Sequence, residues 1–135
     1  MNQALITHIT QAAQQEARRQ GIAITITLVD TGGRVRAVLR DEQCSYFALE
    51  SSRQKAVTAS QLRIPSQMVG ELSQQFPALA ASFVSNAEIS GLPGGLPIRW
   101  QGAVVGGLGV AGGNFEQDRL IAEAALAQLP PEQPQ

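Results

Sequence analysis

Glycine is concentrated in one short stretch of the chain, GLPGGLPIRWQGAVVGGLGVAGG at positions 91–113, which holds nine of the 13 glycines. Apolar residues separate these glycines and predict two short antiparallel strands, 96–100 and 103–110, joined by a two-residue turn at Gln101-Gly102. Glycine within a strand marks a bend, the close approach of another backbone, or a surface of backbone N–H groups that faces a ligand. The sequence leaves these three roles open.

The glycine pattern argues against a nucleotide-binding loop. A Walker-type loop needs a Lys followed by Ser or Thr after its final glycine, and positions 91–113 contain none of these residues. Residues 107–112 do have Gly-x-Gly-x-x-Gly spacing, but a dinucleotide-binding turn joins a parallel strand to its helix. Here the pattern falls inside a predicted antiparallel strand, so the spacing alone carries little weight.

The rest of the chain alternates helical patterns with hairpin patterns. Helices are predicted over 5–20, 45–62, 66–76 and 115–129, and strands over 22–30 and 34–40 in addition to the two above. Asp30-Thr31-Gly32-Gly33 supplies the turn of the first hairpin, and residues 78–91 carry no clear pattern. This order predicts an α+β sandwich, in which helices pack on an antiparallel sheet.

Periodicity and capping residues add detail to these elements. Ser66 and Asn114 are predicted to cap the helices that follow them, and Gly21 to end the first helix. The alternation of residues 22–28 predicts a half-buried strand. The first helix is predicted to bury Leu5, Ile9, Ala12, Ala13 and Ala17. In the last helix, the residues predicted to face the core are Phe115, Leu120, Ile121, Ala124, Ala125 and Leu129.

Length and charge narrow the class of protein. The 135 residues predict one domain over 1–129 followed by a disordered tail over 130–135. A net charge of −1 predicts no nucleic-acid or anionic-membrane partner. The first 20 residues lack the apolar core of a secretory signal, and no apolar run approaches membrane-spanning length. With a single cysteine, these features predict a cytoplasmic protein.

Few residues carry obvious chemistry. Cys44 and His8 are each the sole member of their residue type, so no metal site is predicted. His8 lies at the edge of the apolar stripe of the first helix, where a boundary role competes with that of a ligand to haem or metal. Lys55 lies among Ser and Thr residues in the second helix. Composition favours a solvated helix face there, and an anion-binding site is the alternative.

Four sequence blocks together resemble one family. VDTGGRVRAVLR, SSRQKAVTAS, the stretch at 91–113, and Asp118 with an alanine-rich last helix are similar, in order and spacing, to the GlcG/HbpS family, which includes the C-terminal domain of PduO-type proteins. The resemblance covers about Leu5 to Leu126. It implies a profilin- or roadblock-like α/β/α sandwich, homo-oligomers, and haem binding, or in some members haem degradation or a place in catabolic gene clusters.

The resemblance carries over to individual positions. Asp30, Gly32 and Gly33 match the family's turn, and the helix match includes Ala56 and Ala59. The ligand-binding residues it implies are Ser52, Lys55, Thr58, Gly94, Gly95, Pro97, Gly106, Gly109 and Gly112, with Arg40 beside them. After Arg40 the chain departs from the family, because Asp41-Glu42-Gln43-Cys44 replaces Met-Asp-Gly-Ala.

These features lead to three hypotheses. The first is a homo-oligomer that binds a small molecule, with haem or a related tetrapyrrole as ligand, Lys55 and Arg40 beside its propionates, and His8 as axial ligand. Tyr46, Met68 and Cys44 are weaker axial candidates. The second is an accessory enzyme for a small oxygenated acid or carbonyl compound, with Lys55 as electrophile or base and Glu42 or Asp30 as its acid–base partner. The third is a structural subunit without ligand.

Overall fold

The computed structural model describes residues 1–127, 129 and 130 of the chain. Its helices and strands follow the order α1 (Gln3–Gln20), β1 (Thr25–Val29), β2 (Val35–Arg40), α2 (Tyr46–Leu62), α3 (Ser66–Gln75), α4 (Pro77–Val84), β3 (Gly95–Trp100), β4 (Ala103–Ala111) and α5 (Phe115–Ala127). All strand pairs are antiparallel, in the sheet order β2-β1-β4-β3. Both predicted hairpins are confirmed, and in the structure they span residues 25–40 and 95–111.

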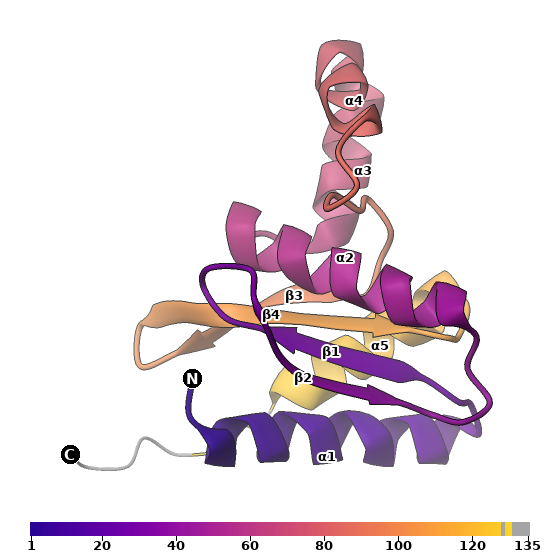
Figure 1. The fold of residues 1–135 in the computed structure, drawn as a ribbon, viewed down its shortest axis with the longest axis vertical. Coiled ribbons are helices and arrows are strands. Elements are labelled where there is room, and N and C mark those ends of the chain that lie inside the picture. The colour runs from indigo at the N-terminus through magenta and orange to yellow at the C-terminus, as the bar shows by residue number, and fades with distance from the viewer. Residues whose placement is uncertain (128, 131–135) are drawn as a thin grey trace.

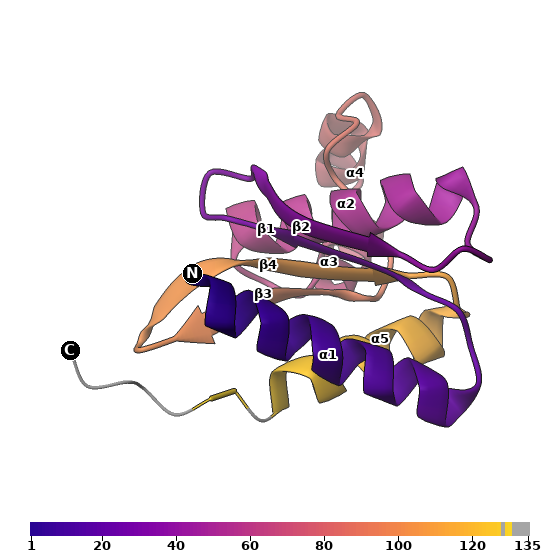
Figure 2. The same ribbon diagram turned by 60° about the horizontal axis from the view of Figure 1, so that its bottom comes forward.

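The sheet separates two helical layers. Helices α1 and α5 lie side by side on one face, and α2 crosses the other face (Figures 1 and 2). Helices α3 and α4 continue from α2 and project away from the body of the molecule (Figure 1). The predicted α+β sandwich is therefore confirmed, with the first and last helices sharing one layer.

Local signals account for most helix ends. The Asn114 side chain accepts a hydrogen bond from the Gln117 N–H at 2.8 Å and begins α5, as predicted. Gly21 ends α1 in the left-handed conformation, with φ of 71°. The predicted cap at Ser66 is wrong. Its hydroxyl donates to the Leu92 carbonyl and accepts from the Gly95 N–H, so it ties α3 to the start of β3.

The main core lies between the sheet and the α1–α5 layer. It is formed by Leu5, Ile9, Ala13, Ala17, Ile24, Ile26, Leu28, Ile98, Leu108, Val110, Ile121, Ala122 and Ala125. Strand β1 is buried along its whole length rather than half-buried, because helices cover both of its faces. Two core assignments in α5 are also wrong, since Phe115 and Leu120 are 58% and 40% exposed.

The glycines of β3 and β4 bring α2 into direct contact with the sheet. A Cβ atom at Gly109 would lie 1.9 Å from the Ser52 carbonyl oxygen, and one at Gly107 would lie 2.2 Å from that of Ala56. Gly95 faces the Lys55 carbonyl oxygen in the same way, at 2.5 Å. Of the three roles left open by the sequence, the close approach of another backbone is the one found at these positions.

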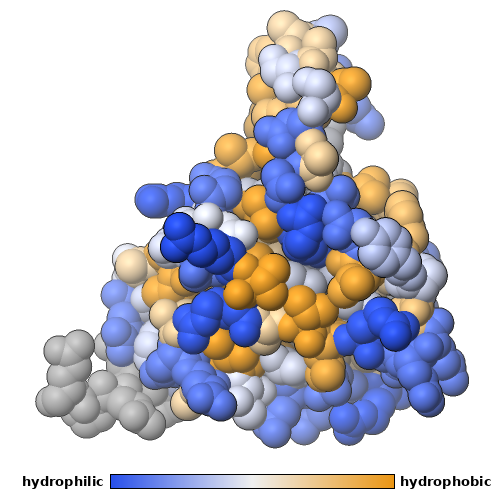
Figure 3. Space-filling view, viewed as in Figure 1, coloured by the Kyte–Doolittle hydropathy of each residue, from blue (hydrophilic) through white to orange (hydrophobic). Residues whose placement is uncertain are grey.

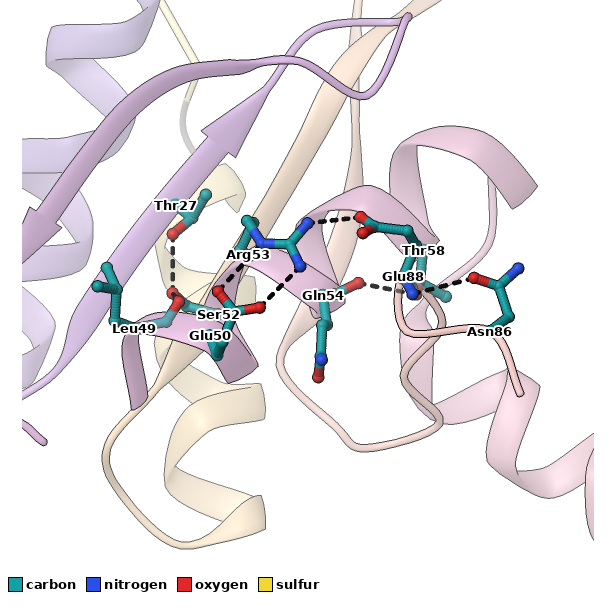
Figure 4. A network of polar contacts seen from close by, with 9 residues as sticks. All are labelled: Thr27, Leu49, Glu50, Ser52, Arg53, Gln54, Thr58, Asn86 and Glu88. Atoms are coloured by element: carbon teal, nitrogen blue, oxygen red, sulfur yellow. Dashed lines mark hydrogen bonds and ion pairs between the residues drawn. The ribbon is translucent and has the colours of Figure 1, made fainter. Parts of the chain in front are cut away.

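The segment without a clear pattern forms α4 and a loop that returns to α2. Figure 4 shows this loop held against α2, where Arg53 bridges Glu50 and Glu88 and the Thr58 hydroxyl reaches the Glu88 carbonyl. The Ser90 N–H also donates to the Thr58 hydroxyl at 2.8 Å. These contacts fix the loop that leads into β3.

Two predictions concern the ends and surroundings of the domain. The domain boundary at residue 129 stays a prediction, and of the predicted tail, residues 131–135 lie outside the described residues. Within the described part of the chain, no helix combines the length and apolar character that crossing a membrane requires.

Candidate functional site

Lys55 is buried at the centre of the molecule. Its Nζ donates to the Val110 carbonyl oxygen at 2.8 Å and to Asp118 Oδ2 at 3.1 Å, and the Lys55 and Asp118 side chains are 2% and 4% exposed. Asp118 Oδ1 also accepts from the Gly113 N–H. The solvated helix face favoured by composition is therefore wrong, because α2 turns Lys55 toward the sheet, where Asp118 at the start of α5 meets it.

Burial shifts the proton affinity of both partners. It lowers the pKa of the Lys55 amine, and the charge of Asp118 only partly opposes this shift. Burial also raises the pKa of the Asp118 carboxyl, against the opposing effects of Lys55 and of the Gly113 N–H. The proton affinities of the two groups are thus brought closer together.

A cleft of about 180 Å³ opens onto this pair. It is lined by Ser45, Phe47, Ala48, Ser51, Lys55, Leu92, Ala111, Gly112, Gly113, Phe115 and Asp118. Lys55 and Asp118 are the charged members of that lining, so their charges cancel. Phe47 and Phe115 are 74% and 58% exposed and supply the aromatic surface of the cleft.

The predicted acid–base partners of Lys55 lie elsewhere. The Asp30 carboxylate accepts from the N–H groups of Gly32 and Arg34 within its own turn, and its pKa is lowered chiefly by the Arg34 hydrogen bond. Glu42 is exposed in the loop between β2 and α2 and does not line the cleft. The carboxylate that lies beside Lys55 is that of Asp118.

Several predicted ligand-binding residues are enclosed by the fold. Ser52 bonds to Thr27, also drawn in Figure 4, and Thr58 bonds to Gln54 and the returning loop. At Gly95 and Gly109 the α2 backbone occupies the space that a ligand would need. Gly106 faces the Val29 carbonyl and the Met1 side chain. The glycines therefore form no ligand floor at these three positions.

The remaining members of the predicted ligand set are scattered. Gly112 lines the Lys55 cleft, and a Cβ at Gly94 would lie 3.1 Å from Lys55 Nζ. Pro97 is half-buried in β3. Arg40 is exposed, donates to the Cys44 carbonyl, and borders a separate cavity between α1 and β2. Arg40 and Lys55 are therefore not brought into one site.

His8 lies on the opposite side of the sheet from Lys55. It is half-buried and lines a groove of about 440 Å³ between α1 and α5, together with Ala12, Gln15, Glu16, Arg19, Ala124 and Ala127. Figures 1 and 2 show α1 and α2 on opposite faces of the sheet, so one ligand cannot contact both His8 and Lys55 in the same chain. Tyr46 and Met68 are exposed on α2 and α3, away from this groove.

The groove at His8 has the features that a haem group needs. An imidazole nitrogen is a common axial ligand to haem iron. Three alanines give the groove an apolar lining of small side chains, and its volume falls in the range of about 300–1,000 Å³ typical of sites for small molecules and cofactors. Arg19 is a cation for a propionate, although it pairs with Glu16 in this structure. The residues present therefore fit a haem group.

Comparison with known proteins decides the family. A family model described as "Haem degrading protein HbpS-like" matches residues 1–127. The chain belongs to the HbpS-like family. An uncharacterized 15.0 kDa protein from the dhaT-dhaS intergenic region of Citrobacter freundii is 33% identical over 119 residues, which is 87% of this chain and 84% of that protein. GlcG of Escherichia coli K12 is 30% identical over 82% of this chain and 81% of GlcG.

A solved structure extends the HbpS-like comparison to a ligand complex. The crystal structure of PduOC with haem has a TM-score of 0.88 and 25% identity, and the match covers 94% of this chain and 93% of PduOC. This agreement confirms the fold and the family resemblance read from the four sequence blocks. It leaves the roles of individual site residues as predictions.

Sequence reasoning missed the residues that surround Lys55. Asp118 is 63 positions away along the chain and was noted only as part of the resemblance. Ser51, Phe47 and Phe115 had no assigned role in a site. One signal was available for the lysine itself, because Lys55 is the only lysine in a chain that contains nine arginines.

Proposed function

We propose that this HbpS-like protein binds haem in the groove between α1 and α5, with His8 as axial ligand. Membership of the HbpS-like family supports the ligand class, as does the strong similarity to a protein solved with haem. The observation that carries the location is the groove itself, which combines the chain's one imidazole with an alanine lining.

Within this proposal each element of the groove has a separate role. Haem supplies an iron centre that accepts a nitrogen ligand. Residues Ala12, Ala124 and Ala127 allow a flat apolar ring to approach the helices closely, and Arg19 offers charge to a carboxylate. Binding would require Arg19 to share its contact with Glu16, which now accepts two hydrogen bonds from it.

A hemin titration tests the proposal. The wild-type protein should produce a saturable shift of the Soret band at a defined stoichiometry, and His8→Ala should lose that shift. Thr7→Ala is the matched control, because Thr7 is exposed on the same helix and does not line the groove. Absence of stoichiometric binding by the wild type would refute haem binding. An unchanged spectrum in His8→Ala would refute the axial role alone.

We further propose that the protein assembles as a homo-oligomer in the cytoplasm. Assembly is supported by the projecting arm formed by α3 and α4. No residue of α4 is buried, and Val84 and Phe76 are 86% and 56% exposed. Figure 3 shows apolar side chains along this arm and in the middle of the same face of the body. Light scattering after size exclusion should give a multiple of the 14.3 kDa chain mass, and a monomer at micromolar concentration would refute the assembly.

A further inference from the structure

The single lysine of the chain occupies an unusual position. Lysine and arginine together number ten, and the nine besides Lys55 are all arginines, which stay protonated in proteins. A lysine can lose its proton when buried and then act as a nucleophile. Lys55 is also the largest fully buried side chain among the described residues. The one side-chain amine is therefore kept from solvent at the inner end of a cleft.

The amine has hydrogen-bonding capacity that the protein does not use. A lysine ammonium group has three donors, and within the described part of the chain two of them find acceptors, at Val110 and Asp118. Ser51 lines the same cleft and is 5% exposed. Its hydroxyl makes no hydrogen bond with any described residue. A third N–H and a hydroxyl are thus available to an oxygen atom of a ligand.

The cleft selects the chemical class of that ligand. Lys55 and Asp118 cancel each other's charge, so a free anion gains no net attraction from the lining. Phe47 and Phe115 present exposed rings that favour a flat apolar body. The volume of about 180 Å³ admits a compact molecule and is too small for a macrocycle. An uncharged compound with a carbonyl group and a small apolar body meets all of these conditions.

We propose that Lys55 forms an imine with a small uncharged aldehyde or ketone bound in this cleft. Asp118 first takes the ammonium proton, and the amine nitrogen adds to the carbonyl carbon. Asp118 then passes this proton to the carbonyl oxygen, which gives a carbinolamine. Asp118 takes a second proton from the nitrogen and passes it to the same oxygen, which leaves as water as the C=N bond forms. One amine and one carbonyl compound thus give one imine and one water, with no oxidation or reduction. Asp118 acts as the proton-transfer group because its Oδ2 already lies 3.1 Å from Nζ.

A purely structural ion pair makes the opposite prediction for reactivity. If Lys55 only ties α2 to β4 and α5, folding should protect it, and it should react faster in the unfolded chain. If the cleft is a carbonyl site, folding should accelerate the reaction, since Asp118 is in place and burial lowers the pKa of the amine. Whether Lys55 reacts faster in the folded or in the unfolded protein therefore distinguishes a carbonyl site from a purely structural ion pair.

Reductive trapping measures the rate at which Lys55 reacts in each state. The wild-type protein is incubated at neutral pH with benzaldehyde and cyanoborohydride, with and without denaturing urea, and Lys55 is followed by peptide mass spectrometry. Trapping adds the mass of the aldehyde less one oxygen atom. The folded protein should modify Lys55 about 100-fold faster than the unfolded chain, the lower end of what a positioned acid–base group contributes. Slower modification in the folded state would overturn the proposal.

Variants and a second probe assign the roles. Asp118→Asn should slow trapping in the folded state, and Glu123→Gln, an exposed position in the same helix, should not. Folding should accelerate the labelling of Lys55 less with glyoxylate, an anionic aldehyde, than with benzaldehyde, and a larger acceleration with glyoxylate would overturn the uncharged class. The comparison of folded with unfolded wild type needs no variant to fold. The haem proposal is tested independently, because His8 lies on the other face of the sheet.

Discussion

Gly109→Ala tests the contact on which the α2 side of the fold depends. The new Cβ would lie 1.9 Å from the Ser52 carbonyl oxygen and 2.8 Å from the Ala56 nitrogen, and both of these are backbone atoms of α2. An ordinary contact begins at 3.4 Å, so α2 would have to retreat by about 1.5 Å. A side chain could rotate away from such a clash, but a helix backbone must move as a unit.

The cost of this change should lie at the upper end for overpacked cores, about 3 kcal/mol or more. A domain of this size has a free energy of unfolding of roughly 5–15 kcal/mol, so the variant should remain folded but lose a large share of its stability. Urea unfolding followed by circular dichroism measures the loss directly. In thermal unfolding the same loss should lower the Tm by roughly 10–15 °C.

Gly32→Ala is the matched control for this experiment. Gly32 lies in the exposed first turn, and its Cβ would meet only Asp30 Oδ1, at 3.4 Å. Its substitution should change the free energy of unfolding by less than about 1 kcal/mol. If Gly109→Ala were no more destabilising than Gly32→Ala, α2 would not rest directly on β4, and the structural reading of the glycine-rich stretch would be wrong.

Three further predictions concern the buried pair and one helix end. Lys55→Met or Asp118→Asn alone should lower the free energy of unfolding by about 3–5 kcal/mol, because the partner stays buried without a counter-charge. The double variant should lose less than the sum of the two single variants. Additive losses in urea unfolding would contradict a coupled pair. Burial raises the pKa of the Asp118 carboxyl, so the folded protein binds the carboxyl proton more tightly than the unfolded chain does. The wild type should therefore lose stability relative to Asp118→Asn as the pH rises from about 4 through the folded pKa. Parallel pH profiles of the two proteins would refute that shift. Asn114→Ala should cost about 1 kcal/mol in thermal unfolding because the Gln117 N–H loses its acceptor, and a change near zero would show that the cap is dispensable.

The parts of the fold that the sequence predicted are those fixed by neighbouring residues. The turn at Asp30–Gly33, the Gln101-Gly102 turn with both φ angles positive, and the cap at Asn114 depend on contacts within about four residues. Family resemblance then supplied the layer arrangement, which local patterns alone leave open. The errors at β1 and Phe115 share one cause. Burial depends on which distant element covers a surface, and alternation within a single strand or helix does not show this.

The site was harder to predict than the fold. Lys55 was placed correctly in a helix, but the side of the helix that faces the sheet is set by glycines some 50 positions later in the chain. Its true partner, Asp118, lies in the first turn of α5, where an acidic residue is common for reasons of the helix dipole alone. The pairing therefore leaves no local signal. His8 was recognised as a candidate, and the groove around it was found only when α1 and α5 were placed side by side.

The glycine-rich stretch and the buried lysine belong to one arrangement. Gly107, Gly109 and Gly95 receive the backbone carbonyls of Ala56, Ser52 and Lys55, so α2 rests on glycine on both sides of the lysine. At this depth the Lys55 side chain reaches the Val110 carbonyl, next to Gly109, and Asp118 beyond it. Bulkier residues at these positions would raise α2 and carry Nζ away from both acceptors. Gly95, Gly107 and Gly109 therefore face the α2 backbone, yet they set the geometry of the cleft. Gly109→Ala should weaken the energetic coupling between Lys55 and Asp118 even in molecules that remain folded.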